Sequence, residues 1–205
     1  MKPILYLATL ICCVFTESSF TKTSIAAEPT EPSDQTIIAF GACAHEDRPQ
    51  PIWNAVVAAK PDRFIFAGDN IYADTTSMDL MRSKYSKLAA QPGYQKLLVT
   101  CPVLAVWDDH DFGINDGGGD LPWRDASQEV FLEAMDLTVE SGQRGVYTRT
   151  RVPVDGGSIL VVALDLRYHK SPYSDVDGDF LGEAQWAWLA ETLQSVKEDA
   201  VVVVS

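Results

Sequence analysis

Short apolar runs alternate along the chain with segments in which apolar residues recur every three or four positions. The runs that we expect to form buried strands are residues 36–41, 63–67, 102–107, 159–164 and 200–205. Helical periodicity predicts helices over residues 51–60, 77–91, 92–99, 125–140 and 182–196. Residues 145–152 alternate between apolar and polar side chains, which is typical of a half-exposed strand. Strands that alternate with helices predict an α/β domain with a largely central sheet.

The last apolar run, residues 200–205, is followed by no turn, helix or tail. A buried strand is seldom the final element of a chain, so we expect the domain to be incomplete at its C-terminus. A natural terminal strand is the alternative explanation.

The first residues have the order of a secretory signal peptide. Lys2 precedes a short apolar run, residues 3–15, and small residues follow at 26–27. The run is shorter than the roughly 20 apolar residues of a transmembrane helix, although an uncleaved anchor or a buried helix is an alternative. We predict a signal peptide over residues 1–27 and a polar linker over residues 28–35. The protein would then be secreted, periplasmic or extracellular, with no integral membrane segment after signal removal.

Composition and charge narrow the function further. A chain of 205 residues with 46% apolar and 10% aromatic side chains can form one domain with a packed core, which excludes wholesale disorder. The formal net charge is −13, whereas nucleic acids and anionic lipids bind to basic surfaces. We therefore predict no nucleic-acid-binding surface.

Segments rich in ionisable side chains follow four of the predicted strands, at residues 43–45, 69–74, 108–111 and 165–167. Because open α/β sheets place their sites at the carboxyl ends of strands, we expect these segments to meet in one crevice. Burying several carboxylates together is costly unless a cation neutralises them. The possible metal ligands are Cys43, Asp69, Tyr72, Asp108, Asp109, His110 and Asp111.

This mixture of donors suits a site with more than one metal ion. Carboxylate and phenolate oxygens suit hard cations, whereas imidazole and thiolate suit transition metals. Two cations about 3.5–4 Å apart can clamp a phosphoryl group and lower the pKa of a bound water. Asp69, at the turn that Gly68 makes, is the candidate for a carboxylate that bridges them.

Two alternatives to a metal site stay open. The three acids around His110 also suit a solvated loop, and Cys43 also suits a disulfide with Cys101. We favour a thiol at Cys43, because the cysteines lie at opposite ends of their strands and the Cα atoms of a disulfide lie within about 7 Å. The acidic residues 174–179 lack the spacing of an EF-hand calcium loop, and we expect them to lead into the next helix.

Several ordered motifs together resemble the metallophosphoesterase superfamily, and within it the alkaline phosphatase D (PhoD-like) branch. They are FGAC at residues 40–43, QPIW at 50–53, GDNIY at 68–72, WDDHDFG at 107–113 and DLR at 165–167. The resemblance implies a layered α/β/β/α sandwich, incomplete at the C-terminus. Residues 36–205 would form the N-terminal portion of a PhoD-like metallophosphatase domain.

The resemblance also implies hydrolysis of phosphate esters by a metal-activated hydroxide. It assigns metal ligation to Cys43, Asp69, Tyr72 and Asp109, with Asp69 as the bridge and Tyr72 as a phenolate ligand of ferric iron. His110 would be catalytic, by stabilising the transition state or protonating the leaving group. The implied cofactors are two or more metal ions, calcium and iron, with other divalent cations as alternatives.

The expected substrate is a small phosphate ester. We expect Asn70 to contact it, and charge and position assign phosphate binding to Arg167. The superfamily's remaining histidine or aspartate ligands follow the strand at residues 200–205, so we expect this chain to hold about half of a dinuclear site. One alternative function is a non-catalytic, truncated metallophosphatase-like secreted binding protein, and another is a calcium-dependent extracellular module.

Overall fold

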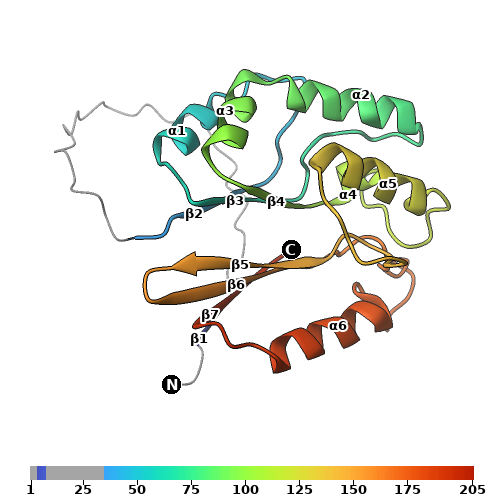
Figure 1. Cartoon of the computed structure of the whole chain (residues 1–205). Helices are drawn as coiled ribbons and strands as arrows, with labels where there is room; N and C mark the ends of the chain where they lie inside the picture. Colours follow the sequence, from blue (N-terminus) through green and yellow to red (C-terminus); the bar gives the residue numbers. More distant parts are fainter. Residues whose placement is uncertain (1–3, 8–34) are drawn as a thin grey trace, which may run out of the picture.

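Two small sheets lie face to face, and helices cover the outer face of each (Figure 1). The structure is a computed structural model that describes residues 4–7 and 35–205. The first sheet is parallel, in the order β2 (Ile38–Gly41), β3 (Arg63–Ala67) and β4 (Val103–Val106). The second has the order β1 (Ile4–Leu7), β7 (Ala200–Val204), β6 (Gly157–Ala163) and β5 (Thr148–Val154), with β5 antiparallel to β6.

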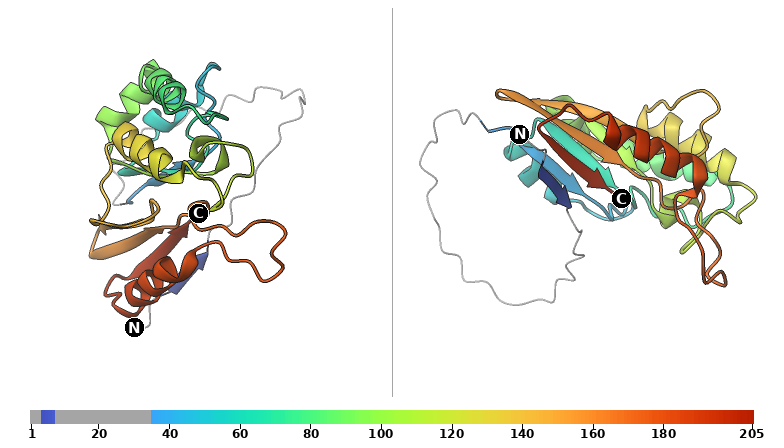
Figure 2. Two further views of the ribbon diagram at one scale, coloured as in Figure 1. Left: turned by 90° about the vertical axis from the view of Figure 1, so that its right-hand side faces the viewer. Right: turned by 90° about the horizontal axis from the view of Figure 1, so that it is seen from below.

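Most helices lie over the first sheet, and one lies over the second (Figures 1 and 2). Those over the first sheet are α1 (Ile52–Ala58), α2 (Met78–Ala89), α3 (Pro92–Thr100), α4 (Asp109–Phe112) and α5 (Arg124–Met135). The second sheet is covered by α6 (Gly182–Gln194). This arrangement confirms the layered α/β/β/α sandwich, and it corrects the single central sheet that the alternation of elements suggested.

Strand β6 shows why the strands have continuous apolar runs. Val161 and Ala163 belong to the main core, which also contains Phe66 of the first sheet. Leu160 and Val162 belong to a second cluster, which packs against α6. Because successive side chains of a strand point to opposite faces, a strand covered on both sides needs apolar residues at every position.

Local chemistry sets the ends of the helices. The side chain of Ser77 accepts a hydrogen bond from the backbone N–H of Leu80 at 3.3 Å and caps α2. Pro92 occupies the first turn of α3, where its missing N–H has no partner to lose. Asp136 has a left-handed φ of 51° and ends α5, so this helix stops short of the predicted residue 140.

The predicted signal peptide and linker fall almost entirely outside the described residues. Strand β1 lies within the predicted signal peptide, and its backbone pairs in parallel with β7. Within the part of the chain that the structure describes, we find no helix long and apolar enough to cross a membrane. The boundaries of the signal peptide and the linker stay predictions.

Gln185 connects α6 to the end of β6 through buried hydrogen bonds. Its side chain has no exposed surface. Its Oε1 accepts from the backbone N–H of Asp165, and its Nε2 donates to the Asp165 carbonyl, each at 2.8 Å. The segment after β6 therefore depends on this amide for two of its backbone partners.

We predict that Gln185→Ala lowers the free energy of unfolding by roughly 2 kcal/mol, because it leaves buried backbone groups without partners. Urea unfolding followed by circular dichroism would measure the change. Gln194→Ala, at an exposed position on the same helix, is the matched control. Equal stability of the two variants would contradict the prediction.

Candidate metal centre

The carboxyl ends of β2, β3 and β4 bring the predicted ligands to one place. The three strands pair in parallel, so they end at the same edge of the sheet. Cys43 follows β2, Asp69 and Tyr72 follow β3, and Asp109 and His110 begin α4 directly after β4. The structure thus gathers in space residues that are up to 67 positions apart in the sequence.

Asp69, Asp109 and His110 form the middle of this group. Each offers one ligand atom, and these atoms all lie within 4.8 Å of one another. The Sγ of Cys43 lies 3.6 Å from Oδ2 of Asp69. Asp69 and Asp109 are each 8% exposed, whereas Cys43 is open to solvent. We call Cys43, Asp69, Asp109 and His110 the acidic cluster.

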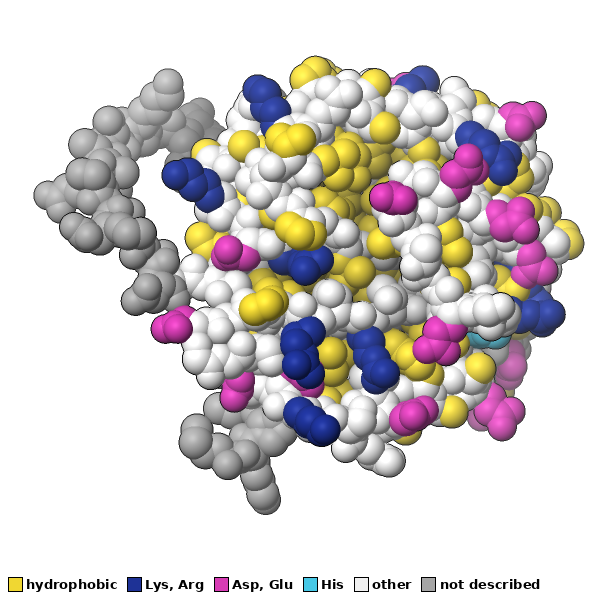
Figure 3. Space-filling model, viewed as in Figure 1, with side chains coloured by type: hydrophobic (Ala, Val, Ile, Leu, Met, Phe, Trp, Pro, Cys, Tyr) yellow, Lys and Arg dark blue, Asp and Glu magenta, His cyan; other side chains and the backbone are white. Residues whose placement is uncertain are grey.

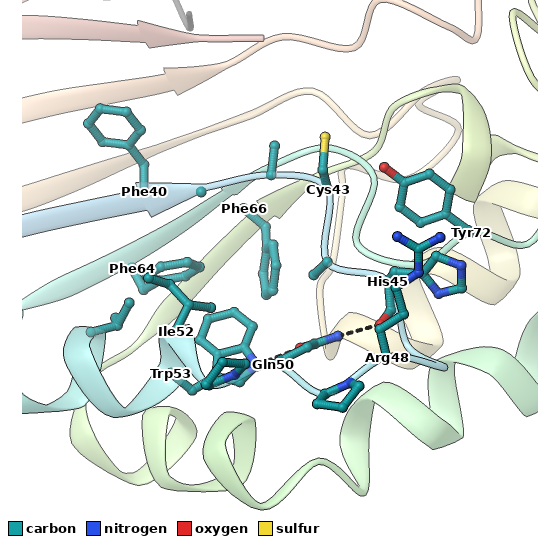
Figure 4. Close-up of a pocket in the computed structure, with 16 residues that line it drawn as sticks. Phe40, Cys43, His45, Arg48, Gln50, Ile52, Trp53, Phe64, Phe66 and Tyr72 are labelled. Atoms are coloured by element: carbon teal, nitrogen blue, oxygen red, sulfur yellow. Dashed lines mark hydrogen bonds between the residues drawn. The ribbon is translucent and has the colours of Figure 1, made fainter. Parts of the chain in front are cut away.

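Tyr72 borders the acidic cluster between two histidines. Its ring stacks on His45 with centroids 4.9 Å apart, and its centroid lies 4.3 Å from that of His110. Figure 4 shows its hydroxyl group pointing toward Cys43. Burial raises the pKa of the Tyr72 phenol far above its ordinary value, and Cys43 and Asp69 act in the same direction. A phenolate at this position therefore needs a cation beside it.

The surroundings of Asp69 fit a bound cation. Burial raises the pKa of its carboxyl, Asp108 and Asp109 raise it further, and His110 opposes them. Its Oδ1 is buried and accepts no hydrogen bond from the described residues. A buried carboxylate oxygen without a partner is costly, and a metal ion bound to it would remove that cost. The donors present are carboxylates, an imidazole, a thiol and a phenol, a set that can hold a metal.

Glu46 binds the backbone of Tyr72 with one carboxylate oxygen and Lys84 with the other. Its Oε2 accepts from the backbone N–H of Tyr72 at 2.9 Å, and its Oε1 lies 2.5 Å from Nζ of Lys84. The neighbouring carboxylate of Asp47 pairs with Lys87 at 2.6 Å. Glu46 and Asp47 also lie close to His45, but these lysines already neutralise that second acidic group.

The loops that carry the acidic cluster have an unusual backbone. Cys43, Asp69 and Asp74 have φ angles of 60°, 49° and 43°. This left-handed region costs a residue with a side chain about 1–2 kcal/mol. Gly68 has φ 99°, and a Cβ at that position would lie 2.6 Å from the Cβ of Asp108. Backbone strain of this kind concentrates at functional sites.

Asn70 and Asp111 are fully buried and join these two loops. The carboxylate of Asp111 accepts from the backbone N–H of Asn70 at 2.9 Å and from its side-chain amide. The same carboxylate accepts from the backbone N–H of Asp108 at 2.6 Å. Burial raises the pKa of Asp111 to about 8, although these hydrogen bonds oppose the increase.

These contacts assign both residues a positioning role. Asp111, a possible ligand by sequence, directs its carboxylate to backbone and amide N–H groups of the protein. The prediction that Asn70 contacts substrate is untested, and its side chain has no exposed surface in this structure. Its amide donates instead to Asp111 and to the carbonyl of Val106.

Asp74 is a site residue to which sequence reasoning gave no role. Its Oδ1 lies 2.7 Å from Nδ1 of His110. Burial by itself lowers the pKa of His110, but Asp74, Asp69 and Asp109 outweigh it and raise that pKa. The ion pair occupies Nδ1 and so leaves Nε2 as the ring nitrogen for a substrate or a metal. The signal in the sequence was the position of Asp74 in the same segment as Asp69 and Tyr72.

Arg167 reaches the acidic cluster from the other sheet, after β6. Its Nε donates to Oδ1 of Asp108 at 2.5 Å, and its Nη2 lies 3.7 Å from Oδ1 of Asp109. The backbone N–H of Asp116, in the glycine-rich loop, donates to the other oxygen of Asp109 at 2.6 Å. Arg167 thus partly compensates the acids, as expected for a residue of this crevice. Its predicted contact with a phosphate is untested.

The structure also tests three other predictions from the sequence. No disulfide joins Cys43 to Cys101, which is buried at the start of β4, so the preference for a thiol is confirmed. Asp165 stays outside the crevice, because it is buried and its carboxylate accepts three backbone N–H groups. Residues 174–179 lead into α6, as predicted, and Asp179 accepts from the first N–H of that helix at 2.7 Å.

Comparison with known proteins identifies the fold. No protein-family model and no curated protein matches the sequence. Among solved structures, the structure of PhoD superposes with a TM-score of 0.63 and covers 81% of this chain, at 17% sequence identity. The fold is PhoD-like. The chain spans 40% of the length of the PhoD chain, so the likeness establishes the fold, and activity has to be argued from the site.

We predict that Asp69→Asn weakens metal binding by about tenfold or more, because it removes a charge from the middle of the acidic cluster. Isothermal titration calorimetry with Ca²⁺ and with Mn²⁺ would measure the affinities. Asp79→Asn is the matched control, since the side chain of Asp79 is 100% exposed on α2. Unchanged affinity in Asp69→Asn would exclude Asp69 as a ligand.

Proposed function

We propose that this chain carries the metal-binding half of a phosphoesterase site and that the protein hydrolyses small phosphate mono- or diesters. The observation that carries the proposal is the convergence of Asp69, Asp109 and His110 within 4.8 Å at the ends of parallel strands. The PhoD-like fold supports it. The predicted signal peptide extends the proposal to an exported enzyme.

Cys43, Asp69, Tyr72 and Asp109 would hold the metal ions. Thiolate and phenolate favour iron, and the carboxylates favour calcium or another divalent cation, which suits the predicted pair. Bound there, the ions would polarise a phosphoryl oxygen and lower the pKa of a water to about 7. The remaining functions, proton donation and phosphate binding, would be performed by side chains of this chain.

His110 would supply the proton to the leaving alcohol. Asp74 fixes the ring through Nδ1 at 2.7 Å, so Nε2 is the atom that can donate. The hydrogen bond with Asp74 raises the pKa of His110, which favours the protonated ring that can act as a donor. Arg167 has five N–H donors, so it can bind a phosphate oxygen while it keeps its bond to Asp108.

The surface charge explains why cations are needed for substrate binding. The formal net charge is −13, and Figure 3 shows acidic side chains concentrated on the right-hand side, where α5 lies in Figure 1. Such a surface repels a phosphate ester at long range. Metal ions and Arg167 would therefore supply the local positive charge.

The second candidate is a secreted, non-catalytic protein that binds metal or a partner. The same acidic cluster supports it, because Asp69, Asp109 and His110 can bind a metal ion without any turnover. Turnover separates the two candidates.

We predict that the chain supplied with Ca²⁺ and Fe³⁺ hydrolyses p-nitrophenyl phosphate and that chelation abolishes the reaction. His110→Asn should lower kcat by roughly 10²- to 10⁴-fold, because it removes the proton donor. His169→Asn is the control, because His169 lies outside the cluster and contacts the Arg144 carbonyl. Hydrolysis that survives chelation would exclude a metal-dependent mechanism, and metal binding without hydrolysis would favour the binding protein.

We also predict that the Fe³⁺-loaded protein absorbs visible light and that Tyr72→Phe removes the phenolate-to-iron charge-transfer band, leaving any band that the Cys43 thiolate contributes. Absorption spectroscopy at matched iron content would show it. Tyr173→Phe, at an exposed tyrosine 101 positions along the chain, is the control. A visible spectrum that Tyr72→Phe leaves unchanged would exclude Tyr72 as the iron ligand.

A further inference from the structure

An apolar pocket of about 540 Å³ opens along β2 and reaches Cys43 and Tyr72. Figure 4 shows Trp53, Phe64 and Phe66 gathered on the side of β2 that faces α1, with Cys43 and Tyr72 beyond the end of the strand. The proposed chemistry uses the last two residues and leaves the aromatic wall without a role. We call this space the β2 pocket.

Hydrogen bonds and ring contacts hold the aromatic wall in place. Nε1 of Trp53 donates to Oε1 of Gln50 at 2.5 Å, and Nε2 of Gln50 donates to the carbonyl of His45 at 2.8 Å. The ring of Trp53 lies 5.5 Å from that of Phe64 and 5.6 Å from that of Phe66, both edge to face. The polar atoms of the wall are thus paired with each other, and the three rings, each at most 4% exposed, form a preformed apolar floor beneath the pocket.

Two exposed apolar side chains, Phe40 and Ile52, also line the β2 pocket, and Figure 4 shows Phe40 on the side of β2 away from the three rings. Phe40 is 56% exposed and Ile52 is 61% exposed. Covering apolar side chains of this size lowers the free energy of the system, so a ligand that contacts them would bind favourably. The exposed Arg48 lines the same pocket and brings positive charge to an acidic protein. An apolar wall with a cation at its rim suits a ligand that is apolar at one end and anionic at the other.

We propose that the β2 pocket binds the aromatic or other apolar alcohol portion of a phosphate ester whose phosphate lies at the acidic cluster. The inference rests on the proposed function and names its substrate class. Cys43 and Tyr72 belong both to the pocket wall and to the predicted ligands, so one molecule can occupy both places. The volume lies in the range of roughly 300–1,000 Å³ that is usual for small-molecule sites.

Paired substrates test the proposal. Benzyl phosphate and ethyl phosphate release alcohols of similar acidity, so a difference in kcat/KM reports contacts with the alcohol portion. A single methylene in an apolar pocket changes this ratio by roughly 10- to 200-fold, and we expect a preference for benzyl phosphate of at least about tenfold. Equal kcat/KM values for the two esters would overturn the proposal.

A variant at the mouth of the pocket locates the preference. Ile52→Asp replaces an exposed apolar residue in the first turn of α1, where an acidic side chain suits the helix dipole, so the variant should fold. It should lower the benzyl-to-ethyl ratio by about tenfold. Leu80→Asp makes the same change at a 46% exposed residue in the first turn of α2, away from the pocket, and should keep the ratio. An unchanged ratio in Ile52→Asp would place the preference elsewhere and overturn the proposal.

Binding separates this inference from the proposed function. If the metal-loaded protein hydrolyses neither ester, the proposed function fails, and calorimetric titration with benzylphosphonate and ethylphosphonate then decides the pocket. Tighter binding of benzylphosphonate that Ile52→Asp weakens would support the pocket assignment without turnover. Equal binding of both phosphonates would overturn it. A dimer that Ile52→Asp dissociates, without any preference for benzyl ligands, would show that a second copy of the chain covers the pocket and would also overturn it.

Discussion

The buried hydrogen bonds between Asn70 and Asp111 determine the geometry on which the rest of the site depends. They join the segment after β3 to helix α4 after β4, and neither side chain has any exposed surface. One residue before Asn70 lies Asp69, and one residue before Asp111 lies His110. The hydrogen bonds between Asn70 and Asp111 therefore also set the distance between Asp69 and His110. A small change at Asn70 would move the two halves of the acidic cluster relative to each other.

This geometry places several carboxylates close together in a strained backbone. Their mutual repulsion destabilises the site unless positive charge nearby opposes it. Asp69 is buried, its pKa is raised, and its Oδ1 accepts no hydrogen bond from the part of the chain that is described. Arg167 binds Asp108 and approaches Asp109, whereas Asp69 is compensated only in part, by His110 and the Cys43 thiol. Local conflicts of this kind are expected at functional sites, where stability is given up for a preorganised arrangement. A cation at Asp69 is the simplest partner for the remaining charge.

The sequence predicts the parts of the fold in which a local pattern and the tertiary environment agree. The residues of β3 form a continuous apolar run because the strand is buried, and the predicted bounds match the observed ones. Helix α4 escaped prediction, because it is four residues long and its sequence, Asp109–Phe112, lacks helical periodicity. The sequence also could not predict that Asp111 and Asp165 bind backbone groups and not a metal ion. The carboxylate of each accepts a hydrogen bond from a backbone N–H in a segment distant in the sequence. Residue type indicates that a carboxylate can bind metal, but only the fold decides which carboxylates face the crevice.

The fold determines where a functional site can lie, and the side chains determine its chemistry. A PhoD-like fold at 17% identity locates the edge of the sheet where chemistry is expected, and many chemistries can occupy such an edge. The side chains narrow the choice, because an acidic cluster of this kind could bind cations, and bound cations would attract phosphate. The wall formed by Trp53, Phe64 and Phe66 narrows it again, since an apolar surface next to a charged centre selects among esters by the alcohol and not by the phosphate that they share. Specificity in this protein would then arise from the helix side of β2, where the packing that stabilises the sheet also shapes the pocket.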